Sequence, residues 1–264
     1  MAHVLPGSWL ARTPIAHRGL HEAAAGRPEN SLAAFEHACA LGFPIELDVR
    51  LTRDRAMVVF HDRTLDRMTG MRARVDQLPV AEVTALPLAG TAERVPLLRD
   101  ALDLVAGRVP LLVHLKREAL SAVLQDGVRG ALRDYPGEVA IQAFQARTLW
   151  QLRRRGEERP IGRLSAQRAV APSVPRFGGR MLSNHVTQPE FVGCRIEALP
   201  RPGVRYWQGR GVTTLAWTVR SPAEAAHALR WADNYIFEGF VPRLNGSAQV
   251  ASTPPSTGSV TPET

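Results

Sequence analysis

Short apolar runs alternate with amphipathic stretches along most of the chain. Strands are predicted near 13–17, 45–51, 57–61, 110–115, 139–144, 160–164, 180–184, 213–218 and 234–238. Apolar residues at helical spacing predict helices near 30–41, 98–106, 119–134, 146–155 and 221–232. Strands that alternate with helices indicate a parallel sheet, and eight such units close a TIM (β/α)8 barrel of roughly 250 residues. We therefore expect an α/β fold of the TIM-barrel type.

Several stretches depart from this regular alternation. The run at 57–61 follows the second strand closely, so we expect it to pair beside that strand as a hairpin. Residues 62–96 have weak periodicity and many turn formers, which predicts a small insertion at the barrel mouth. Residues 165–210 are the least regular, and their Pro, Gly and Arg content hides helices.

The end of the chain changes in character after the last predicted strand. Little chain follows that strand, so the final helix is expected to be short or missing, with Trp9 and Leu10 available to cover its place. Residues 245–264 are rich in Ser, Thr and Pro, which predicts disorder. We expect one barrel domain over 1–244 and a disordered tail over 245–264.

Composition narrows the class of protein. The 264 residues are 45% hydrophobic and carry a net charge of +8, which suits a globular protein that attracts phosphate-bearing ligands. The arginines are scattered and no nucleic-acid-binding motif occurs, so no nucleic-acid partner is expected. No apolar run reaches the roughly 20 residues that span a bilayer, and no signal peptide is recognisable. With two distant cysteines, which we expect to be reduced, this favours a cytoplasmic protein without stable membrane insertion. The sequence carries no signal of the oligomeric state.

The strand predicted at 45–51 carries two carboxylates at i and i+2. Side chains at this spacing point to the same side of a strand, so Glu46 and Asp48 share one face and the apolar residues share the other. Two neighbouring carboxylates repel each other unless a cation lies between them. The pair therefore fits either a solvated polar face or a site for a hard divalent cation.

Two histidines end apolar runs on either side of this carboxylate pair. His17 is followed by Arg18, whose planar fork suits a phosphate, and by Gly19, which permits a tight turn. His61 is followed by Asp62, which can orient it. Each motif alone also fits an ordinary surface turn, but together they supply two candidates for general acid–base catalysis.

Pro28-Glu29-Asn30-Ser31 precedes a stretch with a helical apolar face. Asn30 is a good N-cap residue, and Ser31 or Glu29 can also hold the first turn. The motif is therefore explained by helix capping, by a role at a site, or by both.

In this order, His-Arg-Gly, Pro-Glu-Asn-Ser, Glu-x-Asp and His-Asp resemble the glycerophosphodiester phosphodiesterase family. The resemblance covers roughly residues 13 to 242 and is strongest before residue 70. It implies a TIM barrel with an insertion after the second strand and metal-dependent cleavage of a glycerophosphodiester to glycerol 3-phosphate and an alcohol. The implied residues are Glu46 and Asp48 on the metal, His17 and His61 as acid and base, with His17 favoured as the acid, and Arg18, Asn30 and Lys116 on the substrate.

Three later segments refine what the resemblance implies. His114 stands where the family has a third ligand, a Glu, so one divalent ion is expected, Mg2+ or Ca2+ first and Mn2+ or Zn2+ because of the imidazole. A harmlessly packed histidine is the alternative. Gln142 and Phe144 are candidates to line the pocket, and Trp217 is either a substrate contact or a core tryptophan. Glu238 is given no role beyond the electrostatics of the mouth.

The predicted function is therefore metal-dependent hydrolysis of a small glycerophosphodiester. One alternative is a lysophospholipase D or sphingomyelinase D relative, for which the side chains of Met57, Met68, Met71 and Leu78 can either line an apolar groove or pack within the insertion. Another alternative is a non-catalytic phosphodiester-binding relative with an altered metal site.

Overall fold

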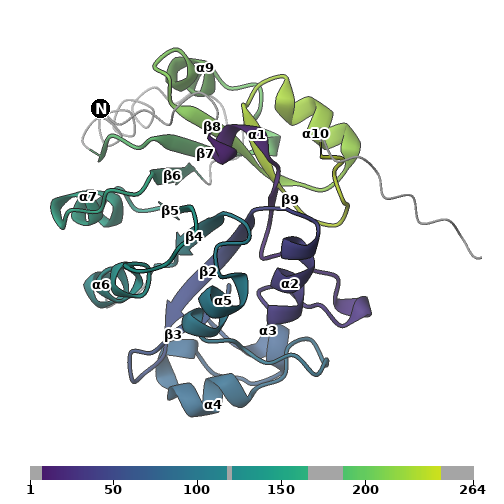
Figure 1. The fold of residues 1–264 in the computed structure, drawn as a ribbon, viewed down its shortest axis with the longest axis vertical. Helices are drawn as coiled ribbons and strands as arrows, with labels where there is room; N and C mark the ends of the chain where they lie inside the picture. The colour runs from purple at the N-terminus through teal and green to yellow at the C-terminus, as the bar shows by residue number, and fades with distance from the viewer. Residues whose placement is uncertain (1–7, 118–120, 166–186, 245–264) are drawn as a thin grey trace, which may run out of the picture.

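Eight parallel strands form a closed barrel in the computed structural model, which describes residues 8–117, 121–165 and 187–244 (Figure 1). Strand β1 pairs with both β2 and β9, and this double pairing closes the ring. The TIM-barrel prediction is confirmed. The barrel strands are β1 (Ile15–Ala16), β2 (Ile45–Leu51), β4 (Leu111–Leu115), β5 (Val139–Ala143), β6 (Ile161–Ser165), β7 (Phe191–Arg195), β8 (Thr213–Val219) and β9 (Asn234–Phe237).

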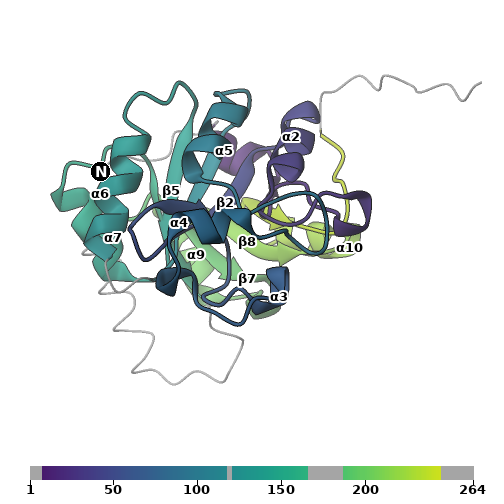
Figure 2. The same ribbon diagram turned by 90° about the horizontal axis from the view of Figure 1, so that it is seen from below.

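Helices surround the barrel, as the alternation of the sequence predicts. In a view from the side of the segment between β2 and α5, the barrel strands lie behind that segment (Figure 2). Helices α6 and α7 lie at one edge of the molecule, and α10 lies toward the other edge. The five predicted helices are all present. The helices outside the barrel are α2 (Leu32–Ala40), α5 (Leu98–Val105), α6 (Ser121–Ala131), α7 (Ala146–Arg154), α9 (Pro202–Gln208) and α10 (Pro222–Leu229). Two short 3-10 helices also lie outside the insertion, η1 (Ala23–Ala25) and η3 (Ile196–Ala198).

The region of low periodicity is where the element prediction fails. The strand expected at 180–184 lies outside the described residues, and the strand between β6 and β8 is β7, which was not predicted. Helix α9 was also missed. Strand β7 contains Gly193 and Cys194 in place of a β-branched run, so its local pattern is weak.

Alternation along the strands divides the core into two layers. On β2, Ile45 and Leu47 face the helices, whereas Glu46 and Asp48 face the barrel interior, as predicted. Apolar side chains fill the interior below them. Phe191 fits there because β6 carries Gly162, where an added Cβ would lie 2.0 Å from the Phe191 ring. The inner cluster is Leu10, Ile15, Leu112, Ala140, Phe191, Leu215 and Ile236.

Helix α1 (Trp9–Arg12) packs at the barrel interior. The side chain of Leu10 belongs to the inner cluster, and the Asn234 amide donates hydrogen bonds to the carbonyls of Leu10 and Thr13 at 3.0 and 2.7 Å. The expectation that Leu10 covers the place of a missing outer helix is therefore wrong. Phe240 and Leu244 pack against the outer core instead, and no helix follows β9 among residues described up to 244. The tail at 245–264 lies outside the described residues.

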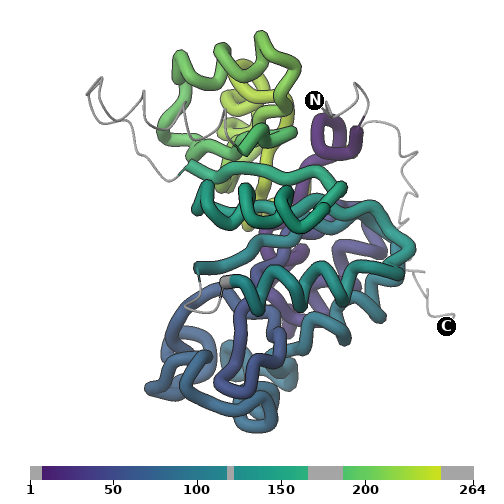
Figure 3. The backbone as a smooth tube through the Cα atoms, turned by 90° about the vertical axis from the view of Figure 1, so that its left-hand side faces the viewer, coloured from purple at the N-terminus to yellow at the C-terminus, as the bar shows by residue number. Residues whose placement is uncertain are grey.

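The chain between β2 and α5 forms a lobe beside the barrel (Figure 3). Strand β3 (Met57–Val59) pairs antiparallel with β2, as the hairpin prediction required. It is followed by α3 (Asp66–Thr69), η2 (Val75–Gln77) and α4 (Val80–Ala85). The lobe has its own buried cluster of Val58, Phe60, Leu65, Met68, Val75, Val83, Leu88 and Val95.

The four side chains considered for an apolar groove do not gather at one surface. Met68 and Leu78 belong to the cluster of the insertion, whereas Met57 packs against the outer core of the barrel. Met71 is exposed. Met57, Met68 and Leu78 therefore pack within the fold, as the second of the two interpretations has it, and Met71 does not.

Two further expectations concern thiols and membrane spans. Cys39 and Cys194 are free thiols, the first half-buried and the second buried. Within the described ranges, every helix is too short or too polar to pass through a lipid bilayer.

Candidate active site

A cavity of about 370 Å³ opens among residues that lie on or just after the barrel strands. Parallel barrels place their functional side chains at the carboxyl ends of the strands, because all the strands end on that side. Every predicted site residue except Asn30 lines this cavity. The predicted residues in its lining are His17, Arg18, Glu46, Asp48, His61, His114, Lys116 and Trp217.

Glu46, Asp48 and His114 form a compact cluster of possible metal ligands. One ligand atom from each lies within 4.8 Å of the others, and all three side chains are buried. His114 is the register neighbour of Asp48 on the adjacent strand, and its Nδ1 lies 2.9 Å from Asp48 Oδ1 and 3.5 Å from Glu46 Oε1. The carboxylate pair is thus not a solvated polar face, and His114 joins it directly.

Asp48 is held from several sides. Asn30 donates to Asp48 Oδ2 at 3.0 Å and accepts from the Asp48 backbone N–H at 3.3 Å, while Lys116 Nζ lies 3.2 Å from Oδ1. Burial alone would raise the pKa of Asp48, but Lys116 and His114 hold it well below the ordinary value. Asp48 is therefore an anion in the interior of the barrel.

Asn30 differs from the other predicted residues because it is buried under the site. Asn30 is 2% exposed and its side chain is hydrogen-bonded to Asp48, whereas the neighbouring Glu29 lines the cavity. Ser31, not Asn30, caps helix α2, because its Oγ accepts from the Ala34 backbone N–H at 3.1 Å. Capping by Ser31 leaves the Asn30 amide available to position Asp48.

The hydrogen bonding of Gln142 indicates whether this cluster of side chains suits a cation. Gln142 lies beside His114 in the sheet and is 1% exposed. Its Nε2 donates to Glu46 Oε1 at 3.2 Å, whereas its Oε1 is a buried acceptor without a hydrogen-bond partner among the described residues. Leaving such an oxygen unpaired costs roughly 1–3 kcal/mol. Two carboxylates, an imidazole and an unsatisfied amide oxygen fit a divalent cation.

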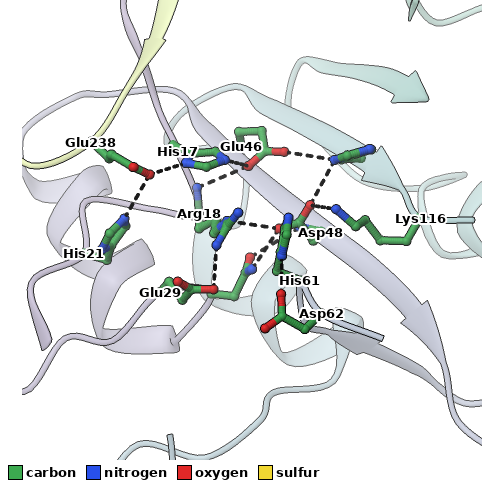
Figure 4. Close-up of polar contacts among 12 residues, drawn as sticks. His17, Arg18, His21, Glu29, Glu46, Asp48, His61, Asp62, Lys116 and Glu238 are labelled. Carbon is green, nitrogen blue, oxygen red and sulfur yellow. Dashed lines mark hydrogen bonds and ion pairs between the residues drawn. The ribbon is translucent and has the colours of Figure 1, made fainter. Parts of the chain in front are cut away.

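His17 is bound by a carboxylate that the sequence analysis set aside. His17 Nδ1 is hydrogen-bonded to Glu238 Oε2, and His21 Nε2 lies 3.8 Å from the same oxygen (Figure 4). Arg220 also contacts Glu238, at 2.7 Å. Burial opposes ionisation, but the His17 hydrogen bond holds the pKa of Glu238 well below the ordinary value. Barrel closure would have revealed this pair, because β1 and β9 are neighbours and Ala16 is opposite Phe237.

His61 has the orienting partner that its motif predicts. Its Nδ1 lies 2.5 Å from Asp62 Oδ1, and Asp62 also accepts from Arg67 Nε at 2.5 Å. Burial opposes ionisation of Asp62, but the Arg67 and His61 hydrogen bonds lower its pKa to about 2. Burial lowers the pKa of His61, and the nearby cations Lys116 and Arg18 act in the same direction. His61 is therefore neutral at neutral pH.

Arg18 is anchored by the Pro-Glu-Asn-Ser motif. Its guanidinium donates to Glu29 at 2.7 Å, and its Nε lies 3.5 Å from Asp48 Oδ2. Its backbone is left-handed, with φ 57°, and its N–H donates to Glu46 Oε2 at 3.2 Å. Gly19 follows with φ 81°, which confirms the predicted turn.

An apolar wall lies beside the metal-ligand cluster. Phe144 contacts the rings of His114 and Trp217, with centroids 5.4 and 5.8 Å apart. The Arg195 guanidinium lies over the Trp217 ring, 5.3 Å from its centroid. Both Phe144 and Gln142 line the cavity as predicted, and Trp217 lines it rather than lying wholly in the core.

Comparisons with known proteins indicate one family. Residues 17–239 match the model of the glycerophosphoryl diester phosphodiesterase family. A glycerophosphodiester phosphodiesterase of Caldanaerobacter subterraneus subsp. tengcongensis is 34% identical over 72% of this chain and 82% of its own. The protein YhdW of Bacillus subtilis (strain 168) is 29% identical over 80% and 88%.

Among solved structures, an Oleispira antarctica phosphodiesterase in complex with the product sn-glycerol-3-phosphate has the same fold. The two superpose with a TM-score of 0.74 at 22% identity, over 86% of this chain and 92% of that one. The match to the family model and the 34% identity to one relative establish membership of the family, whereas the structural similarity alone establishes the fold. The chain therefore belongs to the glycerophosphoryl diester phosphodiesterase family and is an enzyme of that class.

Proposed function

We propose that this enzyme hydrolyses a small glycerophosphodiester to glycerol 3-phosphate and an alcohol, with one divalent cation and with His17 and His61 as acid and base. One observation carries the proposal. The buried cluster of Glu46, Asp48 and His114 borders the same cavity as two histidines, and each histidine is bound to its own carboxylate. This arrangement provides charge for the phosphoryl group and a proton carrier for each of the two oxygens that react.

Glu46, Asp48 and His114 would hold the cation, and Gln142 Oε1 is available beside them. When bound, the cation withdraws charge from the phosphoryl oxygens. The imidazole favours Mn2+ or Zn2+ more than an all-oxygen site would, with Mg2+ and Ca2+ still served by the carboxylates.

The two histidines have different environments, which supports different roles for them. His61 is kept neutral by burial and by neighbouring cations, so it can accept the proton of the attacking hydroxyl, from water or from the glycerol of the substrate. The carboxylate of Glu238 is hydrogen-bonded to His17 Nδ1 and orients the ring, whose Nε2 lies 4.0 Å from Glu46 Oε2 at the cavity. His17 then donates its proton to the departing alcohol as the phosphorus–oxygen bond breaks.

The remaining predicted residues bind the substrate or position a ligand of the cation. Arg18 and Lys116 lie on either side of Asp48 and would contact phosphoryl oxygens, with Trp217 forming the apolar wall for the organic part of the substrate. Asn30 positions Asp48. The expectations of a cytoplasmic location and a small-molecule partner remain predictions.

The proposal is tested by stripping the protein of metal and supplying Mg2+, Ca2+, Mn2+ or Zn2+ separately. Release of glycerol 3-phosphate from glycerophosphocholine and from glycerophosphoglycerol is followed for each ion. We expect release that depends on one of these ions. No release with any ion from folded protein overturns the proposal, and exclusive cleavage of a lysophospholipid favours the alternative with a larger substrate.

A further inference from the structure

The rim of the cavity opposite the metal-ligand cluster is basic. His17 follows β1, and the neighbouring strands β9, β8 and β7 bring Glu238, Arg220 and Arg195 onto the same arc. Because a general acid must reach the oxygen of the leaving alcohol, the alcohol departs along this arc if His17 is the acid. The side chains of the arc therefore face the part of the substrate that varies between glycerophosphodiesters.

Both arginines of the arc reach solvent at the cavity. The Arg195 side chain is 27% exposed and pairs with Glu197, which does not line the cavity. The Arg220 side chain is 54% exposed and pairs with Glu238. Guanidinium groups offer several donors to hydroxyl and phosphate oxygens and repel a cation.

No carboxylate of the described lining is left to receive a cationic alcohol. Glu46 and Asp48 belong to the metal-ligand cluster, and Glu29 is held by Arg18 and Arg67. Glu238 is held by His17 and Arg220. Each acidic side chain that lines the cavity thus has a cationic or imidazole partner.

Arg195 also covers part of the aromatic surface of the cavity. A quaternary ammonium group is usually received by the face of a Trp, Tyr or Phe ring. One face of Trp217 carries the Arg195 guanidinium, 5.3 Å from the ring centroid, and the ring meets Phe144 at 76°. A trimethylammonium group would have to displace Arg195 to stack on that face of Trp217.

We propose that the leaving alcohol is negatively charged, carrying a second phosphate group, and that neutral polyols rank next and choline last. Arg195 and Arg220 bind the second phosphate while water cleaves the bond between the first phosphorus and the alcohol oxygen, and His17 returns a proton to that oxygen. The inference rests on the proposed reaction and adds the class of substrate.

Three diesters that share the glycerophosphoryl part provide the test. These are glycerophosphocholine, glycerophosphoglycerol and glycerophosphoglycerol 3-phosphate, and phosphorus NMR follows loss of the diester signal for each. We expect kcat/KM for the phosphorylated diester to exceed that for glycerophosphocholine by about tenfold or more, and this advantage to shrink with added salt. An equal or higher value for glycerophosphocholine overturns the inference and leaves the proposed reaction standing.

Variants of Arg195 test whether this side chain sets the preference among the three diesters. Arg195→Gln should reduce the preference for the phosphorylated diester, and Arg195→Glu should abolish or reverse it. Arg99→Gln removes the same charge from α5, where the side chain is 75% exposed, and should leave the ratio unchanged. An unchanged ratio in Arg195→Glu overturns the assignment.

A binding measurement keeps the two proposals distinguishable. The His61→Ala variant loaded with Mn2+ is titrated calorimetrically with the same three diesters. Tighter binding of the phosphorylated diester supports the inference even without turnover. Equal binding of all three overturns it, whereas absence of turnover by the wild-type enzyme with every ion and every diester overturns the reaction.

Discussion

Arg67 donates to Glu29 through two nitrogens, at 2.6 and 3.0 Å, and through its Nε to Asp62 at 2.5 Å. Glu29 in turn holds Arg18, and Asp62 holds His61. One arginine from the insertion therefore joins the partner of the phosphate-binding arginine to the partner of the proposed base. The insertion is tied to the chemistry of the barrel through this side chain.

Replacing Arg67 by Met should lower kcat by about tenfold to a hundredfold, because outer partners of this kind orient the groups that react. The pKa of Glu29 should rise toward its ordinary value, since the Arg67 hydrogen bond helps to lower it. Steady-state kinetics of Arg67→Met and Arg99→Met give the measurement and its control. Wild-type kcat in Arg67→Met would show that Arg18 and His61 keep their places without it.

The lowered pKa of His61 predicts how kcat/KM falls on the acidic side of its pH profile. Burial lowers this pKa below its ordinary value of 6.5, so the neutral form that acts as a base persists as pH falls and is lost only below that value. A cation bound near Asp48 acts in the same direction. We expect kcat/KM to decline with an apparent pKa below 6.5, and a decline centred above 7 would contradict the assignment of His61.

The variant Glu238→Gln tests whether His17 is the general acid that protonates the leaving alcohol. Loss of the carboxylate that orients His17 should reduce turnover of an alkyl diester by about tenfold or more. A diester with a p-nitrophenol leaving group needs no proton, so its cleavage should change much less. His17→Ala should show the same contrast more strongly with its fold intact. Equal losses on both substrates would indicate that His17 and Glu238 do not protonate the leaving group.

His114→Glu should change the metal that the site prefers. A third carboxylate replaces the imidazole, which raises affinity for the hard ions Mg2+ and Ca2+ relative to Mn2+ and Zn2+. Calorimetric titration of the metal-stripped protein measures this without turnover. Gln142→Leu is the companion variant, and it should weaken binding of every ion by removing the unpaired amide oxygen. Unchanged affinity and preference in His114→Glu would exclude His114 as a ligand.

Gly19→Ala should destabilise the fold by about 1–3 kcal/mol. Gly19 has φ 81°, and an added Cβ would lie 2.8 Å from the Phe35 ring and 3.0 Å from the Ala34 backbone. Gly26→Ala is the matched control, because Gly26 has φ 74° with nothing within 4 Å. Urea unfolding should show the larger loss for Gly19→Ala. Equal losses would mean that left-handed backbone, not the contact with α2, is what the glycine provides.

The features that depend on local periodicity could be predicted from the order of the residues alone. The alternation around Glu46 and Asp48 places them on one face, because successive side chains of a strand point to opposite sides. The same reasoning placed seven of the eight barrel strands and the antiparallel β3. It also brought His17, His61 and Lys116 to the ends of strands, where the cavity lies.

The contacts between distant side chains depend on how the elements pack in three dimensions. Glu238 binds His17 because ring closure sets β9 beside β1, a contact between the two ends of the barrel that no local pattern contains. Arg67 reaches Glu29 because the insertion lies against the segment that precedes α2, and Asn30 positions Asp48 because Ser31 takes the cap of α2. Periodicity determines the direction of a side chain along its own element, whereas its partner depends on long-range packing.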